Sequence, residues 1–156
     1  MAAIQDRLRD NFCWGCGADN PDGLQLKSTW DGKVATATWT PDVVHAAGPR
    51  HLLNGGIIAT VLDCHGVCTA IAAAYDREGR PIGSEPEIWC ATASMTVEYL
   101  RPTPLGTPLH LRSEVVEHDD RRTTVTCVLE ADGKERARAR VDAVRVPAAW
   151  KHGSER

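Results

Sequence analysis

The sequence predicts an α+β fold in which an antiparallel β-sheet is wrapped around one long central helix. The longest apolar segment, 54–75, has the length and residue spacing of a single buried helix. The pairs Asp31-Gly32 and Asp132-Gly133 are typical of hairpin turns, which join antiparallel strands. Alternation of apolar and polar residues predicts six strands, at 24–30, 34–39, 91–100, 109–117, 123–130 and 135–146. A sheet curled around the helix is the economical way to bury the apolar surface of both.

The central segment predicts a helix that is enclosed by other structure. Apolar residues recur at spacings of three and four, which places them on one helix face: Ile57, Val61, Cys64, Cys68 and Ile71. Further apolar residues widen this face almost all the way round, namely Ile58, Leu62 and Val67. Gly55 and Gly56 open the helix, and glycines there let another chain or a ligand approach the first backbone N–H groups. Those groups carry the positive end of the helix dipole.

Asp63 is a carboxylate in the middle of this apolar helix. A buried carboxylate without partners is costly, so Asp63 is expected to be paired, to face a cleft or to be functional. The residues three, four and seven positions away are mostly small, which leaves room for a ligand or a second helix: Ala59, Gly66, Val67 and Ala70. Two interpretations stay open. Asp63 is either a functional group, or a packing residue that accepts a hydrogen bond from a backbone or tryptophan N–H.

The spacing of Gly55 and Asp63 favours a site made by two chains. If the glycine N–H groups polarise a carbonyl that Asp63 attacks, or that water activated by Asp63 attacks, both must reach one carbon within about 3 Å. The two residues are eight positions apart, which is roughly 12 Å along one helix. Two helices running antiparallel across a two-fold axis would supply the glycine from one copy and the aspartate from the other.

Composition excludes several classes of function. The chain has 156 residues and a net charge of −3 with both signs mixed, so nothing favours nucleic acid or an anionic membrane as a partner. The N-terminus lacks an apolar signal core, and no run is expected to be long and uncharged enough to span a bilayer. We therefore expect a cytoplasmic protein whose six cysteines are reduced thiols.

The chain divides into three parts by pattern. Residues 1–23 are expected to hold a short helix over 4–11 and a cysteine-bearing loop, 24–147 the sheet-and-helix domain, and 148–156 a C-terminal tail whose last six residues are disordered. Cys13 and Cys16 have C-x-x-C spacing. As no second C-x-x-C or close histidine pair follows, the sequence predicts a tight turn rather than a metal site.

Four segments together resemble a known family, the hotdog-fold thioesterases, in the branch related to the phenylacetic-acid-pathway (PaaI-like) thioesterases. CWGCGADNPDGLQLK is similar to the cysteine-bearing N-terminal signature of that branch. NGGIIATVLDCHG is similar to the family's H-G-G motif followed by an acidic residue on the central helix. YLRPTPLG and the final strand with ADGKERARA also fit, in the same order along nearly the whole chain.

The resemblance implies hydrolysis of an acyl-CoA thioester at the interface of a homodimer, which either stands alone or pairs into a homotetramer. Matched to the motif, Gly55 with Gly56 beside it offers backbone N–H groups to the thioester oxygen, and Asp63 is the nucleophile or general base. Asn54 stands where the family usually has histidine, and an asparagine donates a hydrogen bond but takes no proton near neutral pH. The chemistry requires neither a cofactor nor a metal.

Three further residues are candidates for binding substrate. Arg101 follows the strand at 91–100 and either contacts a CoA phosphate or is an ordinary surface arginine. His51 lies in the loop before the helix and either lines a site near the helix start or is solvated. Val67, one turn after Asp63, is expected to contact the acyl group.

Two functions compete with the thioesterase interpretation. The asparagine at position 54 also suits a non-catalytic protein that binds acyl-CoA or another apolar ligand. A hydratase acting on an enoyl thioester would pair an aspartate with a histidine in one short motif. Asp63 and His65 are close in sequence but lie on different helix faces, which argues against the hydratase.

Overall fold

The structure, a computed structural model, describes residues 1–153 and confirms the predicted fold. One long helix, α1, spans Gly55–Arg77 and lies against a six-stranded antiparallel sheet. The strands are β1 Ser28–Trp30, β2 Val34–Trp39, β3 Trp89–Tyr99, β4 Leu109–His118, β5 Arg122–Ala131 and β6 Lys134–Val146. Short helical turns at Gln5–Arg7 and Val43–His45 and a four-residue helix, α2 Ala148–Lys151, complete the described elements.

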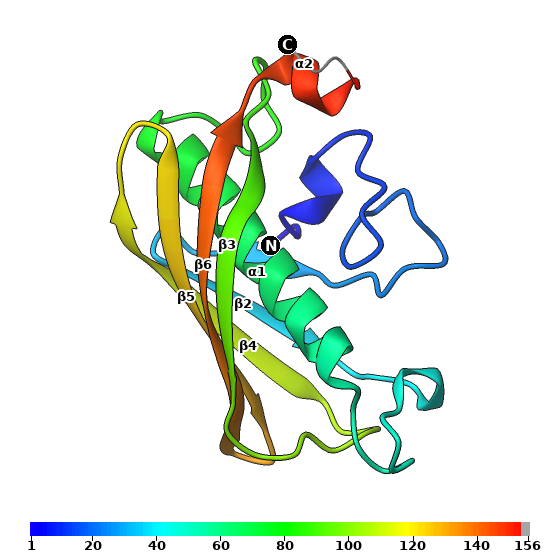
Figure 1. Ribbon diagram of the computed structural model, residues 1–156. Helices are drawn as coiled ribbons and strands as arrows, with labels where there is room; N and C mark the ends of the chain where they lie inside the picture. The colour runs from blue at the N-terminus through cyan, green and yellow to red at the C-terminus, as the bar shows by residue number, and fades with distance from the viewer. Residues whose placement is uncertain (154–156) are drawn as a thin grey trace.

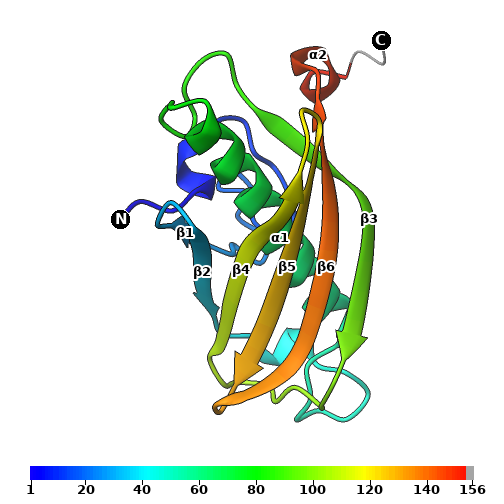
Figure 2. The ribbon, with the colours of Figure 1, turned by 90° about the vertical axis from the view of Figure 1, so that its left-hand side faces the viewer.

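The sheet has the strand order β1-β2-β4-β5-β6-β3, and every neighbouring pair is antiparallel (Figure 2). Side chains alternate between its two faces, as β6 shows: Ala137, Ala139 and Val141 are buried, while Arg138 and Arg140 are exposed. Strand β3 is an edge, because among the described residues it pairs with β6 alone. Its other side therefore offers unpaired backbone groups.

Helix α1 crosses the concave face of this sheet, as Figure 1 shows. Its buried residues include Val61, Leu62 and Ile71, which are all at most 1% exposed. Gly66 permits the close approach, because a Cβ there would lie 2.8 Å from Val141 Cγ2 on β6. The enclosure predicted from the apolar pattern is therefore present, and it comes from the sheet on one side and the N-terminal segment on the other.

The expectation that no run is long and uncharged enough to span a bilayer is wrong, because one helix meets the criteria of length and composition. Helix α1 passes that test, with a mean hydropathy of 1.7 over its most apolar window. However, 72% of this window is buried inside the fold. Its apolar surface is thus directed at the sheet and the N-terminal segment, as in the core helix of a folded domain.

The N-terminal segment differs from its prediction in two places. Only Gln5–Arg7 is helical, as a single 3-10 turn, because the backbone of Leu8 is extended and ends it. The Gln5 side chain contacts strand β1, where its Oε1 accepts from Ser28 N at 2.8 Å. The first strand begins at Ser28 and not at Leu24. Leu24 N and Leu26 N donate to carbonyls of the cysteine-bearing loop instead, at 2.8 and 3.1 Å.

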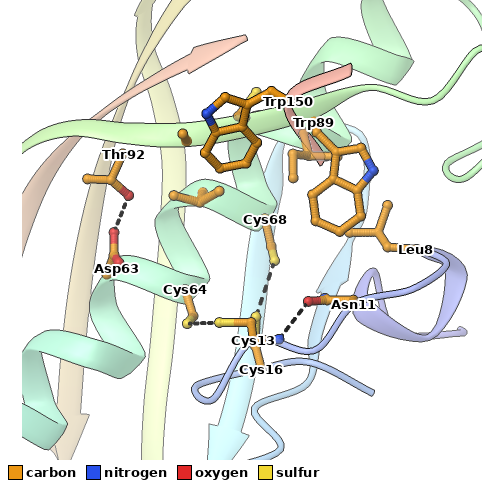
Figure 3. A pocket seen from close by; sticks show the side chains of 14 residues that line it. Leu8, Asn11, Cys13, Cys16, Asp63, Cys64, Cys68, Trp89, Thr92 and Trp150 are labelled. Carbon is orange, nitrogen blue, oxygen red and sulfur yellow. Dashed lines mark hydrogen bonds between the residues drawn. The ribbon is translucent and has the colours of Figure 1, made fainter. Parts of the chain in front are cut away.

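The C-terminal segment is partly ordered, contrary to the expected disordered tail. Helix α2 ends at Lys151, whose Nζ donates to Glu87 Oε2 and to Arg9 O, both at 2.7 Å. These contacts hold α2 against the N-terminal segment and the residues before β3, and Trp150 lies near Trp89 (Figure 3). The remainder of that expectation, for 154–156, lies outside the described residues.

His65 on α1 is fully buried between the helix and strands β1 and β2. Its Nε2 lies 3.3 Å from the Ala35 carbonyl and its Nδ1 lies 2.8 Å from Ser28 Oγ. A carbonyl can only accept, so Nε2 carries the proton and Nδ1 accepts from the serine hydroxyl. Burial lowers the pKa of His65 from 6.5 to about 4, and the ring is neutral at pH 7.

We predict that this histidine makes stability fall as the pH falls from 6.5 to about 4. In that window the unfolded chain binds a proton at position 65 that the folded chain does not. Each pH unit is equivalent to about 1.4 kcal/mol, so the loss is about 3 kcal/mol. The free energy of unfolding, measured with urea at several pH values in this range, should depend less steeply on pH for His65→Gln than for the native protein. His110→Gln, at an exposed histidine, is the control; an unchanged slope in His65→Gln contradicts the assignment.

Candidate active site

Asp63 lies on the face of α1 that is turned toward the edge strand β3. It is half-buried, and its Oδ1 accepts a hydrogen bond from Thr92 Oγ1 on β3 at 2.5 Å (Figure 3). Burial raises the pKa of the Asp63 carboxyl above its ordinary value, and the hydrogen bond from Thr92 offsets part of that rise. A carboxylate held in this way is a stronger base than one in water.

A cavity of about 340 Å³ opens beside Asp63. Its walls are mainly apolar or thiol side chains from α1, β3, the N-terminal segment and α2, among them Val67, Trp89, Trp150 and Cys64. Figure 3 shows the two tryptophans on one side of this space and the cysteines on another. A partly open apolar space with a single carboxylate suits an apolar group whose reacting end reaches that carboxylate.

The first turn of α1 is capped by its own asparagine. Asn54 Oδ1 accepts from Gly56 N at 2.7 Å and from Ile57 N at 3.2 Å, as expected for an N-cap asparagine. The Gly56 N–H is thereby engaged within the chain. Within residues 1–153 no acceptor contacts the Gly55 N–H, so this group is the one left for a ligand at the helix start.

A second cavity, of about 360 Å³, lies at this end of the helix. Gly55, Tyr99 and Arg101 are among its lining residues. The Tyr99 hydroxyl donates to Gly55 O at 2.8 Å, which ties the end of β3 to the helix start. The guanidinium of Arg101 is exposed, and one of its N–H groups donates to Glu135 O at 2.8 Å. His51 is exposed and does not line either of these two cavities.

The predicted site residues therefore fall into two groups within one chain. Asp63 and Val67 line the cavity beside β3, whereas Gly55 and Arg101 line the cavity at the helix start. Asn54 lies next to the second group as the helix cap. One chain does not bring the carboxylate and the Gly55 N–H together, in agreement with their separation of roughly 12 Å along the helix.

Some residues of the site were not identified from the sequence. Thr92 looked like one of several exposed strand residues, and only its hydrogen bond to Asp63 distinguishes it. Trp150 was assigned to the tail, although it lines the Asp63 cavity. A large aromatic residue followed by a lysine near the chain end was the available signal, since such residues often anchor a segment on a core.

An antiparallel sheet wrapped around one long central helix is the hotdog fold, which this chain shares with solved thioesterase superfamily structures. The thioesterase-like superfamily matches residues 4–148, which is nearly the whole chain. The protein therefore belongs to this superfamily.

Solved structures agree with this assignment. A thioesterase superfamily protein from Shewanella loihica is 33% identical, with a TM-score of 0.60, over 78% of this chain and 91% of that one. A phenylacetic acid degradation-related protein from Ralstonia eutropha is 18% identical, with a TM-score of 0.64, over 78% of this chain and 85% of that one. The PaaI protein of Escherichia coli, from the phenylacetic acid degradation operon, is 16% identical, with a TM-score of 0.62, over 80% of this chain and 81% of that one. No curated protein sequence matches the chain.

We predict that Thr92→Val raises the pKa of Asp63 further. The valine keeps the shape of threonine but removes the hydroxyl whose hydrogen bond favours the charged carboxylate. Thr92→Ser retains the hydroxyl and is the matched control. The ¹³C NMR shift of the Asp63 carboxyl, followed through a pH titration, measures the effect directly. A midpoint in Thr92→Val at or below that of the native protein would show that the hydrogen bond does not stabilise the charge.

Proposed function

We propose that the protein is a cytoplasmic acyl-CoA thioesterase that acts as a homodimer. The observation that carries the proposal is the half-buried Asp63 carboxylate, which lines an apolar cavity. The chain that holds it belongs to the thioesterase-like superfamily. Hydrolysis of a thioester consumes water and releases a carboxylate and a free thiol. It requires a base or nucleophile near the carbonyl carbon and a donor near the carbonyl oxygen.

Strand β3 supports a composite site between two chains. It is an eleven-residue edge strand, and its ends contact the two halves of the site, Thr92 with Asp63 and Tyr99 with Gly55. Antiparallel pairing of β3 with a second copy would be isologous, so that residue i faces residue j in both directions. Pairing centred on Thr96 sets side chains of the same face opposite each other, and the register shift between Thr92 and Ser94 then brings Thr92 close to the partner's Tyr99. The partner's helix start then comes next to Asp63.

In this arrangement each residue has a distinct role. Asp63 attacks the thioester carbonyl carbon or removes a proton from the water that does so. The Gly55 N–H of the other chain donates to the carbonyl oxygen, where negative charge develops; a donor of this type contributes roughly 3 kcal/mol. Asn54 takes no proton. Its capping bonds hold the first turn so that the Gly55 N–H remains available.

The two cavities suit the two ends of an acyl-CoA. The apolar cavity beside Asp63 and Val67 is the place for the acyl group. Arg101 lies with Gly55 at the helix start and is exposed, so its guanidinium is placed to contact a phosphate of CoA at the rim of the same composite site. His51 lines neither cavity and is the weaker candidate for such a contact.

We predict that the protein releases thiol from acyl-CoA substrates and that Asp63→Asn lowers the rate by about 10³-fold, within the range for loss of a catalytic base. The asparagine is isosteric and still accepts from Thr92, so the fold is expected to persist. A panel of short, long and aromatic acyl-CoA thioesters, followed with a thiol reagent, provides the measurement. If the native protein is stabilised against heat by acyl-CoA yet turns over no member of the panel, it is a binding protein, as the asparagine at position 54 would also allow.

We predict that Gly55→Pro lowers kcat by about 10²- to 10³-fold, whereas Gly55→Ala changes it only slightly. Proline removes the N–H and is well tolerated at the first position of a helix. The extended backbone of Asn54, with ψ 133°, is compatible with a following proline. Alanine keeps the N–H, and its Cβ would lie 3.5 Å from the Tyr99 ring, an ordinary contact. Equal activity in the two variants would remove the Gly55 N–H from the mechanism.

A further inference from the structure

Four cysteine thiols converge between the N-terminal loop and helix α1, on one wall of the Asp63 cavity (Figure 3). Cys13 and Cys16 come from the loop, and Cys64 and Cys68 come from successive turns of the helix. The Sγ atoms of Cys13 and Cys64 are 3.7 Å apart, and those of Cys16 and Cys68 are 4.0 Å apart. Cys13, Cys16 and Cys64 have their Sγ atoms all within 4.8 Å of one another.

We propose that these four cysteines bind one zinc ion. In a tetrahedral site with Zn–S bonds of about 2.3 Å, neighbouring sulfurs are about 3.8 Å apart. The Cys13–Cys64 and Cys16–Cys68 pairs are close to this spacing, and the sulfurs of Cys13, Cys16 and Cys64 already lie around a common point. Cys68 lies outside that group of three, so its Sγ would move toward the other sulfurs to become the fourth ligand. Thiolate ligands in a compact tetrahedron favour zinc over the oxygen-preferring cations.

The loop is built to bring its two thiols against the helix. Gly17 N donates to Cys13 O at 2.8 Å, which closes a tight turn around the C-x-x-C pair. A Cβ at Gly17 would lie 2.4 Å from Cys13 N, so the turn excludes any side chain there. A Cβ at Gly15 would lie 2.3 Å from Cys64 Sγ. Glycine at both positions is thus required for the loop thiols to reach the helix thiols.

Ordinary core packing does not account for this arrangement. Buried cysteines often serve as small apolar residues, and Cys90 and Cys127 are of that kind, since neither belongs to the group of close sulfurs. The other four form two close pairs between residues 51 and 52 positions apart, and three of them lie within 4.8 Å of one another. The sequence interpretation missed them because the second pair has C-x-x-x-C spacing on a helix, which looks like part of an apolar stripe.

The proposed site is structural rather than catalytic. Four thiolates fill the coordination sphere, and their four protons are released as the ion binds. Cys13 is exposed, which gives the ion a path from solvent, while Cys16, Cys64 and Cys68 are buried. The ion would fasten the N-terminal segment to α1 and so fix the wall of the cavity next to Asp63.

The test is the metal content of the full chain, purified without chelators or a metal-affinity tag. We expect about one zinc per chain by elemental mass spectrometry. Replacement of zinc by Co²⁺ should give intense visible bands of tetrahedral geometry and a sulfur-to-cobalt charge-transfer band. A chain without metal that also fails to bind added Zn²⁺ or Co²⁺ overturns the proposal. A Cys13–Cys64 disulfide, seen as a mass two hydrogens lower in the freshly purified chain, overturns it as well.

Single substitutions locate the ligands. Cys13→Ser and Cys64→Ser are expected to lose the zinc. Cys68→Ser should weaken it by about tenfold or more, since loss of a ligand costs at least as much as loss of an outer-shell partner. Cys90→Ser and Cys127→Ser are the matched controls and should retain one zinc per chain, with circular dichroism to confirm folding. Full metal content in Cys13→Ser and Cys64→Ser, or its loss in the controls alone, would place the ion elsewhere.

Discussion

The enclosure of helix α1 is the constraint on which the rest of the structure depends. The helix has so little polar surface that both the sheet and the N-terminal segment must cover it (Figure 1). A charged group on such a helix can be accommodated only where the cover is open, because an unpaired buried carboxylate is costly. Asp63 lies at that opening and has Thr92 as its hydrogen-bond partner. The position of the candidate site thus follows from the packing of the core.

The same helix separates the two halves of the chemistry we propose. Its free N–H is at the first residue, and its carboxylate is two turns further on, so the two groups line different cavities of one chain. Strand β3 contacts both places and has an open edge. Pairing of two chains at that edge would bring the carboxylate of one chain next to the helix N–H of the other, which one chain alone does not do. The N-terminal segment completes the cavity, and its cysteines contact those of α1 there.

Local pattern was sufficient to predict most of the fold. Five of the six strands and the central helix were found within a few residues, because period-two and helical spacing reflect burial on one face. The prediction failed where tertiary contacts decide local structure: Leu24 and Leu26 bond to a loop rather than to a strand. For the site, an unusual carboxylate in an apolar run was visible in sequence. Thr92, Trp150 and the contacts between loop and helix thiols were not, because each depends on contacts between distant segments.

The most direct test of the composite site is complementation between two inactive variants. Asp63→Asn lacks the carboxylate and Gly55→Pro lacks the donor, so mixed dimers formed by co-expression contain one site with both groups intact. With random pairing half of the dimers are mixed, and the account predicts about a quarter of native activity. Native mass spectrometry would establish that mixed dimers are present. If they are present and the mixture is as inactive as either variant alone, the carboxylate and the glycine N–H do not act across two chains.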